Sequence, residues 1–269
     1  MRPMAAPVHP PRAGAPADER GTEMRRNHDQ PSVSLSWPPG TLLGCLSSKA
    51  RASLLALGTT VSVRPGDHIL REGDTGSHLI LLREAITKVT VNMTDGRQAL
   101  LAIRVSGDVV GEISALNDTP RTATVTTCGV GLISVIHKRD WHPFLLDQPD
   151  AALALARTTA ARFRWANQRR VDFTAYPAKI RLARVLAELS TTHGEITGAG
   201  RTVGVTLTQP ELASLCGAAE PTVEKALREL RQAGVIQTGY RQIIVHDVAQ
   251  LQRVGHLDDS DRTWTASTN

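Results

Sequence analysis

The 269-residue sequence predicts an α+β fold, made of an N-terminal antiparallel β-roll, one long helix and a C-terminal winged helix-turn-helix. Three observations predict it. Short β-rich runs alternate with Gly, Pro and Asp turns from Thr60 to Ile136. An Ala-rich stretch without glycine follows, from Trp141 to Phe173. A helix-capping motif, a glycine and a short hairpin then come in close succession near the C-terminus.

The composition limits the function classes. A net charge of +5 permits an anionic partner without requiring one, and 3% aromatic residues argue against an aromatic platform for single-stranded nucleic acid. No apolar run approaches the ~18 residues of a membrane span, so we expect a cytoplasmic protein without membrane contact. Cys45, Cys128 and Cys216 form no disulfide or metal pattern and are expected to be small buried side chains in a reducing compartment.

Composition also divides the chain. Residues 1–40 are rich in Pro, Ala and Arg and have no hydrophobic period. A disordered tail or a start codon assigned too early explains them better than a targeting peptide. We expect the β-roll in 41–150, the long helix in 151–176, the winged helix-turn-helix in 177–254 and a flexible tail in 255–269.

The β-roll region begins with a helical pattern from Leu42 to Leu57. Asp95-Gly96 lies between two strand-like runs, which is a strong hairpin pattern. His68 and His78 lie in turn-like stretches. Either could ligate a haem, but a solvated or hydrogen-bonded histidine is the commoner case.

The Ala-rich stretch predicts one helix of about 20 residues or more, which ends at Pro177. A narrow stripe recurs along it at three- and four-residue steps: Leu155, Thr159, Arg162, Phe163, Ala166, Arg170 and Phe173. A helix of this kind often pairs with its own copy in a symmetric dimer, and we favour that arrangement. The alternative is a helix that packs only against its own β-roll.

A second helix is predicted from Ala178 to Ser190, followed by a Gly-rich loop from Thr192 to Arg201. The apolar side chains on one face of this helix are Ile180, Leu182, Val185, Leu186 and Leu189.

Thr208–Glu211 is a capping box at the start of a short helix, and Gly217 supplies the left-handed turn to a second helix. Proline disfavours helical angles in the residue before it, so Glu220 is expected to be the N-cap of that helix. Two short strands around Gly239 would form the wing. The expected inward positions are Leu212, Leu215, Val223, Leu227 and Leu230, and the outward ones are Thr222, Lys225 and Arg228. Such a helix fits the major groove of DNA, although a helical pair can also serve packing alone.

The loop from Val109 to Val125 carries the other candidate site. Glu112 can accept a hydrogen bond from a ribose hydroxyl, and Arg121 can bind phosphate oxygens in pairs. Thr122 and backbone N–H groups near Gly111 can complete a phosphate cradle. A cyclic nucleotide presents both a hydroxyl and one charged phosphate, but a surface Glu–Arg pair is more often structural.

The run GEISALNDTPRTATV resembles the phosphate-binding cassette of cyclic-nucleotide-binding domains. With RPGDHILREGDTGSHLILL before it and a winged helix-turn-helix after it, the chain resembles the CRP/FNR superfamily of bacterial transcription regulators over residues 42–250. The resemblance implies a homodimeric, sequence-specific regulator without enzymatic activity, controlled by cAMP, another cyclic nucleotide or a related small effector. It also implies double-stranded DNA, a second copy of the chain and RNA polymerase as partners.

The resemblance assigns effector contacts to Gly111, Glu112, Ile113, Arg121, Thr122, Arg162 and Asn167. Glu112 would take the ribose hydroxyl and Arg121 the phosphate. Arg162 stands where members place a basic residue that links the long helix to the cassette glutamate. In cAMP-responsive members a Thr-Ser pair reaches the adenine. Ala166 and Asn167 stand there in this chain, so only an amide is available to a purine edge.

The DNA-reading helix departs from the family pattern as well. Well-known members carry Ser-Arg-Glu-Thr-Val where this chain has AEPTV. We therefore expect an operator unlike the usual family palindrome, with two half-sites still about one helical turn apart. Glu220 would favour amino-bearing base edges such as that of cytosine. The predicted DNA contacts are Thr208, Gln209, Ala219, Glu220, Pro221, Thr222, Lys225 and Arg228.

Two alternatives remain open. The cassette could be vestigial, so that DNA binding is independent of any ligand. The chain could also be a cyclic-nucleotide-controlled enzyme or a kinase-regulating subunit. Against that interpretation, residues 1–40 hold no convincing pseudosubstrate, and the sequence has no nucleophile–base set and no metal motif such as HExxH. We expect no metal site.

Overall fold

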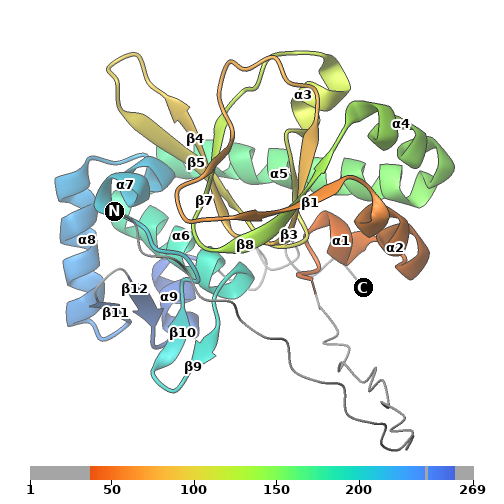
Figure 1. Ribbon diagram of the computed structural model, residues 1–269. Coiled ribbons are helices and arrows are strands. Elements are labelled where there is room, and N and C mark those ends of the chain that lie inside the picture. Colours follow the sequence, from red (N-terminus) through yellow and green to blue (C-terminus); the bar gives the residue numbers. More distant parts are fainter. Residues whose placement is uncertain (1–36, 240–241, 258–269) are drawn as a thin grey trace, which may run out of the picture. The chain divides into compact units, whose positions relative to one another are not determined.

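The computed structural model describes residues 37–239 and 242–257 (Figure 1). The predicted tails, 1–40 and 255–269, lie mostly outside these residues. No helix of the described part is long and apolar enough to cross a membrane.

The chain enters the fold through two short helices, α1 (Leu42–Cys45) and α2 (Ser48–Ala56), in the stretch with the predicted helical pattern. Each begins at a hydroxyl, since the side chains of Thr41 and Ser47 accept hydrogen bonds from backbone N–H groups of the first turn. The caps satisfy donors that the helices themselves leave unpaired.

Two four-stranded antiparallel sheets build the β-roll, with the strand orders β1-β8-β3-β6 and β2-β7-β4-β5. The strands are β1 (Thr59–Val63), β2 (His68–Leu70), β3 (Leu79–Glu84), β4 (Thr87–Asn92), β5 (Gln98–Arg104), β6 (Val109–Val110), β7 (Thr124–Thr127) and β8 (Gly131–Ile136). Side chains from both sheets pack on each other, among them Leu70, Ile80, Leu82, Val125 and Ile133. The predicted antiparallel β-roll is confirmed.

The predicted hairpin joins β4 to β5. Backbone bonds link Met93 N to Arg97 O at 2.7 Å and Gly96 N to Met93 O at 3.0 Å, which closes the turn around Asp95-Gly96. The register pairs Asn92 with Gln98 next to the turn and Thr87 with Arg104 at the far ends of the strands. Turn chemistry alone was enough to predict this element.

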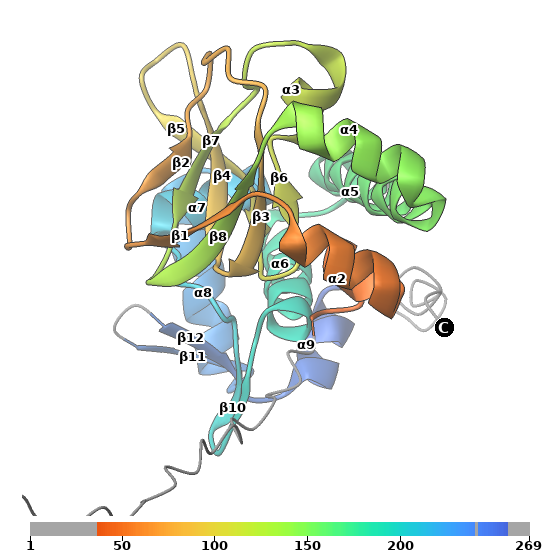
Figure 2. The ribbon, with the colours of Figure 1, turned by 45° about the vertical axis from the view of Figure 1, so that its right-hand side comes forward.

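The helix α3 (Glu112–Asn117) lies between β6 and β7, and α4 (Lys138–Asp147) and α5 (Pro149–Ala175) follow the last strand of the β-roll. The long helix is confirmed, with 27 residues. The sequence did not predict α4 as a separate helix. The chain breaks at Gln148, whose φ of −126° and ψ of 79° are not helical, because the residue before a proline avoids helical angles. Figures 1 and 2 show α4 and α5 side by side, in agreement with their contacts.

Most of the predicted stripe on α5 is exposed: Thr159, Phe163, Ala166, Arg170 and Phe173, with Arg162 half-buried. Leu155 is the exception, because it is buried with Ala151 and Ala154 in a core shared with α1 and α4. A line of exposed positions at alternating three- and four-residue steps, here called the exposed stripe, runs along the helix through Leu153, Ala156, Ala160, Phe163, Asn167, Arg170 and Thr174. The β-roll covers one face at the start of the helix, which periodicity alone could not reveal.

The C-terminal domain contains α6 (Ala178–Thr192), β9 (Ile196–Thr197), β10 (Gly200–Thr202), α7 (Gln209–Cys216), α8 (Glu220–Gln232), β11 (Ile236–Gly239), β12 (Gln242–Val245) and α9 (Val248–Val254). Its sheet has the order β11-β12-β10-β9, so the predicted wing at Gly239 is confirmed. The stretch from Thr192 to Arg201 is not a simple loop, because β9 and β10 form a small hairpin that adds to the wing.

The predicted capping box at the start of α7 is present. The Thr208 side chain accepts a hydrogen bond from Glu211 N at 3.4 Å, and Glu211 Oε2 accepts one from Thr208 N at 2.8 Å. Gly217 ends the helix in the left-handed conformation, with φ 58°. One detail was wrong: the N-cap of α8 is Ala219, and Glu220 is its first helical residue. Because Pro221 then stands in the first turn, its missing N–H removes no helical bond.

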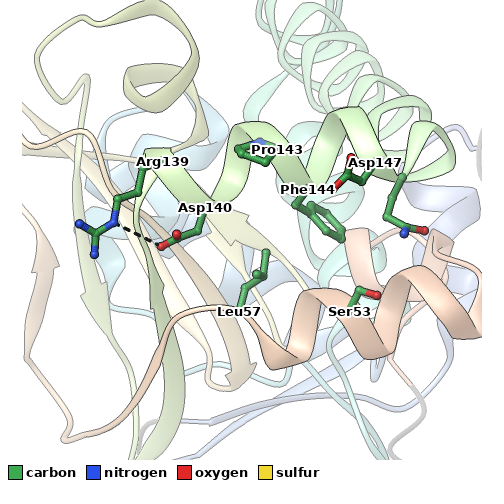
Figure 3. Close-up of a pocket in the computed structure, with 8 residues that line it drawn as sticks. Ser53, Leu57, Arg139, Asp140, Pro143, Phe144 and Asp147 are labelled. Atoms are coloured by element: carbon green, nitrogen blue, oxygen red, sulfur yellow. Dashed lines mark ion pairs between the residues drawn. The ribbon is translucent and has the colours of Figure 1, made fainter.

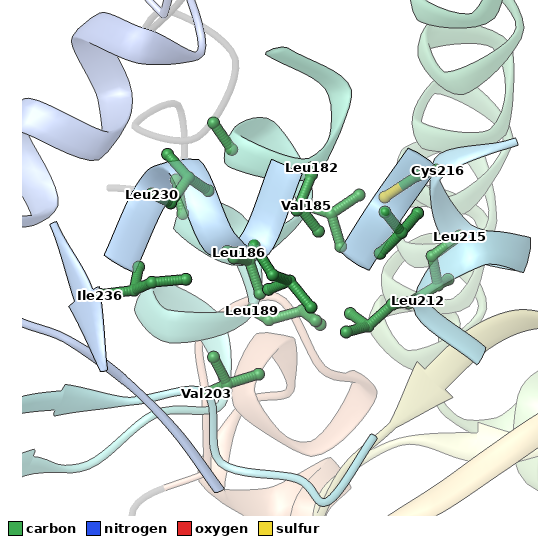
Figure 4. Close-up of a cluster of buried hydrophobic side chains, with 14 of the residues drawn as sticks. Leu182, Val185, Leu186, Leu189, Val203, Leu212, Leu215, Cys216, Leu230 and Ile236 are labelled. Atoms are coloured by element: carbon green, nitrogen blue, oxygen red, sulfur yellow. The ribbon is translucent and has the colours of Figure 1, made fainter. Parts of the chain in front are cut away.

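Apolar side chains of α6, α7, α8 and the wing share one core (Figure 4). The predicted inward residues Leu212, Leu215, Val223, Leu227 and Leu230 are all buried. On α6, four of the five predicted residues, Leu182, Val185, Leu186 and Leu189, are buried, and Ile180 is half-buried. Each fully buried leucine contributes roughly 1.5–3 kcal/mol, so this core fixes the angle between the two helices of the helix-turn-helix.

Candidate functional site

Six of the seven residues assigned to the effector line one cavity of about 100 Å³. They are Gly111, Glu112, Ile113, Arg121, Thr122 and Arg162. Arg121 and Glu112 are buried, whereas Thr122 and Ile113 are exposed. Asn167 does not line the cavity of this chain; it lies on α5, where both it and Ala166 are exposed.

Gly111 makes room for an arginine. It caps α3 with a φ of 82°, a left-handed conformation that favours glycine. A Cβ added to it would lie 2.6 Å from Nη1 of Arg121. In its absence Arg121 Nη1 donates a hydrogen bond of 3.0 Å to the Gly111 carbonyl. The sequence predicted a close backbone approach here, and the structure shows that the approaching group is a guanidinium.

Backbone carbonyls hold Arg121 inside the protein. The residue is 4% exposed, and its Nη2 donates a second hydrogen bond, of 2.5 Å, to the His78 carbonyl. Burial lowers the pKa of Arg121, while the negative charges of Asp74 and Glu112 oppose that shift. A phosphate at this position would replace neutral carbonyl acceptors by an anion, which forms a stronger, charge-assisted bond.

Arg162 connects the cavity to α5. Its Nη1 lies 2.7 Å from Glu112 Oε1, and its Nη2 lies 3.0 Å from both Asp108 Oδ1 and the Val109 carbonyl. Burial by itself lowers the pKa of Arg162, but the charges of Asp108 and Glu112 outweigh burial, so the pKa is raised. The resemblance implied a basic residue between the long helix and the cassette glutamate, and Arg162 occupies that place.

Sequence reasoning missed two charged residues at this site. Asp108 is buried and pairs with Arg162. Arg104, the last residue of β5, lines the cavity beside the cassette residues. A charged residue after the apolar run of β5 was the one signal that could have indicated Arg104.

A larger hollow, of about 360 Å³, lies between α2 and α4 (Figure 3). Ser53, Leu57, Pro143 and Phe144 line it, and its charged residues include Arg139 and Asp140, which face each other at 3.9 Å. It contains none of the predicted site residues. Arg139 and Asp140 neutralise each other, and both side chains are exposed to solvent, so neither charge is held ready for a ligand.

The predicted DNA-contacting residues all lie on the surface of the helix-turn-helix. Thr208 and Gln209 are exposed at the start of α7, Ala219 is exposed at the N-cap of α8, and on α8 itself the predicted residues Glu220, Pro221, Thr222, Lys225 and Arg228 are all exposed. Arg228 Nη2 lies 3.1 Å from Glu224 Oε1, so part of its charge is already paired on the helix. The predicted contacts at the start of α8 are thus exposed, which major-groove binding requires.

An ion pair joins the β-roll to the helix-turn-helix. Lys88 Nζ on β4 lies 2.7 Å from Glu211 Oε1 and 2.8 Å from its Oε2. Glu211 also completes the capping box of α7, so one carboxylate serves both contacts. The side chains are 18% and 22% exposed, which limits screening by solvent.

The remaining candidates give no site. The three cysteines are free; Cys216 is buried, which raises its pKa to about 12, and Cys45 and Cys128 are only half-buried. The prediction of buried cysteines is therefore confirmed for Cys216 alone. His68 bonds Thr126 Oγ1 at 2.8 Å. Within the part of the chain that the structure describes, no three His, Cys, Asp or Glu residues gather as metal ligands.

Comparisons with known proteins cover both domains. The model of the cyclic nucleotide-binding domain matches residues 60–148, and that of the Crp-like helix-turn-helix domain matches residues 180–254. The CRP-like cAMP-activated global transcriptional regulator of Mycobacterium tuberculosis is 30% identical over 190 residues, 70% of this chain and 84% of that protein. The Cyclic AMP receptor protein of Thermus thermophilus is 25% identical, again over 70% of this chain and 84% of the relative.

Solved structures agree with these matches. A CRP/FNR-family transcriptional regulator of Thermus thermophilus gives a TM-score of 0.62 at 26% identity. The match covers 74% of this chain and 98% of that one.

Proposed function

The chain belongs to the CRP/FNR superfamily of DNA-binding transcription regulators, and from that premise we propose that it is a homodimer whose DNA binding is controlled by a cyclic nucleotide. The observation that carries the proposal is the contact of Arg162 with Glu112. The carboxylate suited to a ribose hydroxyl is bonded directly to the long helix. An effector that engages Glu112 therefore acts on α5.

The charge of the site suits a cyclic phosphate. Three guanidiniums line the cavity, those of Arg104, Arg121 and Arg162, and Glu112 is the one carboxylate in its described lining. Asp108, which pairs with Arg162, and Asp74, whose charge acts on Arg121, offset part of this positive charge. A cyclic nucleotide brings one negative charge, which a cavity lined mainly by guanidiniums attracts.

The exposed stripe on α5 supports a dimer. Leu153 is 52% exposed and Phe163 is 67% exposed, and the stripe they belong to follows three- and four-residue steps. Apolar side chains at that spacing pack against a second helix of the same kind. Two copies of α5 would place both Asn167 side chains in the seam, where the amide of one copy can approach the effector of either.

Control would operate as a population shift. The effector must bind one packing of the α5 pair better than another, and the attached helix-turn-helix domains then move as a pair. In the active arrangement the two α8 helices would enter half-sites about one helical turn apart. Thr222 and Lys225 would contact DNA, and Glu220 would favour the amino edge of cytosine. RNA polymerase, in the cytoplasm, is the expected further partner.

The direct test is selection of bound duplexes from random DNA with the purified full-length chain, with and without cAMP or cGMP. We expect a two-fold symmetric site whose affinity changes at least tenfold with one nucleotide. Arg121→Ala should remove that change, while Arg71→Ala, at an exposed position of the same domain, should retain it. The proposal would be contradicted if no duplex were enriched, or if the protein sedimented as a monomer.

One observation favours a ligand-independent regulator as the second candidate. The hydrogen bonds of Arg121 are satisfied by the carbonyls of Gly111 and His78, and the cavity is smaller than the ~300 Å³ of ordinary ligand pockets. Under this alternative the β-roll only supports dimerisation. Calorimetry distinguishes the two, because the alternative predicts no heat with either nucleotide.

A further inference from the structure

Arg104 is a third guanidinium in the cavity, and none of the contacts proposed so far gives it a partner atom on the effector. Its side chain belongs to the sheet face that carries Val89 and Ala102, and Val89 also lines the cavity. Nη1 donates a hydrogen bond of 3.0 Å to the carbonyl of Ile103, its own neighbour in sequence. Among the residues that the structure describes, no carboxylate forms an ion pair with it.

Keeping this charge in the cavity is costly for the folded protein. Burial lowers the pKa of Arg104 to about 10, and the positive charge of Arg162 contributes to the shift. Asp108 and Glu112 oppose it, but both are bonded to Arg162. Arg104 is half-buried, and the side-chain hydrogen bond that the structure gives it uses Nη1, so its other N–H groups are available to a ligand.

The cavity brings the two arginines together from different elements. Arg121 is bonded to the carbonyls of Gly111 and His78, at the cassette. Arg104 is the last residue of β5 and lines the same cavity together with Arg162 of α5. A cyclic nucleotide with its phosphate at Arg121 and its ribose at Glu112, the carboxylate that Arg162 contacts, would extend its base toward α5 and Arg104.

A guanidinium at that end discriminates between purines. Guanine offers two adjacent acceptors, O6 and N7, and a guanidinium binds this pair in a bidentate manner. Adenine offers N7 but presents an amino donor in place of O6, so one N–H group of the arginine would face another donor. Resting on the function proposed above, we propose that Arg104 pairs with O6 and N7 of guanine and makes cyclic GMP the preferred effector.

The test is calorimetric binding of cyclic GMP and cyclic AMP to the full-length protein. We expect the wild type to bind cyclic GMP at least tenfold more tightly. Arg104→Met should weaken cyclic GMP binding roughly tenfold to hundredfold and change cyclic AMP binding less than threefold. The control is Arg97→Met, which removes an arginine with a 73% exposed side chain next to the same strand and should change neither affinity.

Cyclic IMP tests the contact without any variant. It keeps O6 and N7 but lacks the 2-amino group, so it should bind within a few-fold of cyclic GMP. A wild-type preference for cyclic AMP, equal weakening of both nucleotides by Arg104→Met, or poor binding of cyclic IMP would each overturn the assignment of Arg104 alone. Binding of none of these nucleotides to the wild type would overturn the proposed function together with it.

Discussion

Replacement of Arg162 by methionine would remove the cation that two buried carboxylates share. The side chains of Asp108 and Glu112 are 11% and 10% exposed, and that of Arg162 is 18% exposed. Leaving such a charge without its partner costs roughly 3–5 kcal/mol. Arg104 lies close enough to compensate part of that loss, so we expect a destabilisation of about 3 kcal/mol. For a protein of this size the melting temperature should fall by about 6–12 °C.

Urea denaturation followed by circular dichroism measures this loss. Arg157→Met is the matched control, because Arg157 is exposed on the same helix, and it should change the free energy of unfolding by less than about 0.5 kcal/mol. A double-mutant cycle with Asp108→Asn should give a coupling energy of at least about 1 kcal/mol. A cost below about 1 kcal/mol for Arg162→Met, or additive effects in the cycle, would refute the argument that this arginine neutralises the carboxylates.

Three further changes test other parts of the molecule. Phe163→Glu should raise the dimer dissociation constant at least about 100-fold in sedimentation, since two buried phenylalanines contribute roughly 3–6 kcal/mol; Leu146→Glu, on the exposed surface of α4, should not. An unchanged constant would exclude the α5 stripe as the interface. Lys88→Ala should speed amide exchange in α7 about fivefold by removing the Glu211 pair while leaving its capping box, and equal rates would argue against this contact. Burial lowers the pKa of His193 from 6.5, so the unfolded chain binds its proton more tightly. Its contribution to stability is retained above pH 6.5 and lost as the pH falls below that value, and His193→Gln should reduce this loss in melting curves recorded from pH 7 to 5. Superimposable pH profiles of the wild type and His193→Gln would count against this role of His193.

Local chemistry made parts of the fold predictable. The Asp95-Gly96 turn, the Thr208 capping box and the Gly217 turn each depend on residues that are neighbours in sequence. Such elements need no information about the rest of the chain. The hydrophobic faces of α6, α7 and α8 were predictable for a related reason, because helical periodicity states which residues share a side.

Other elements depend on what lies beside them. The strands β9 and β10 have two and three residues, β9 exposed and β10 half-buried throughout, so no alternating pattern marks them; β10 pairs with the edge that β12 offers. The break between α4 and α5 was missed because Pro149 can either interrupt a helix or begin one. Leu155 was assigned to an exposed stripe because periodicity does not say which face the β-roll covers.

The sequence by itself determined the order of the domains, the family and the cassette pair Glu112 and Arg121, because the residues that carry this information lie close together along the chain. Only the tertiary structure decided that Arg162 also binds Asp108, that Lys88 reaches Glu211, and that Arg104 lines the effector cavity. These groups come from separate strands and helices. The energy between two charges depends on their distance in space, and burial strengthens the interaction. Both the distance and the burial are set only when the chain has folded.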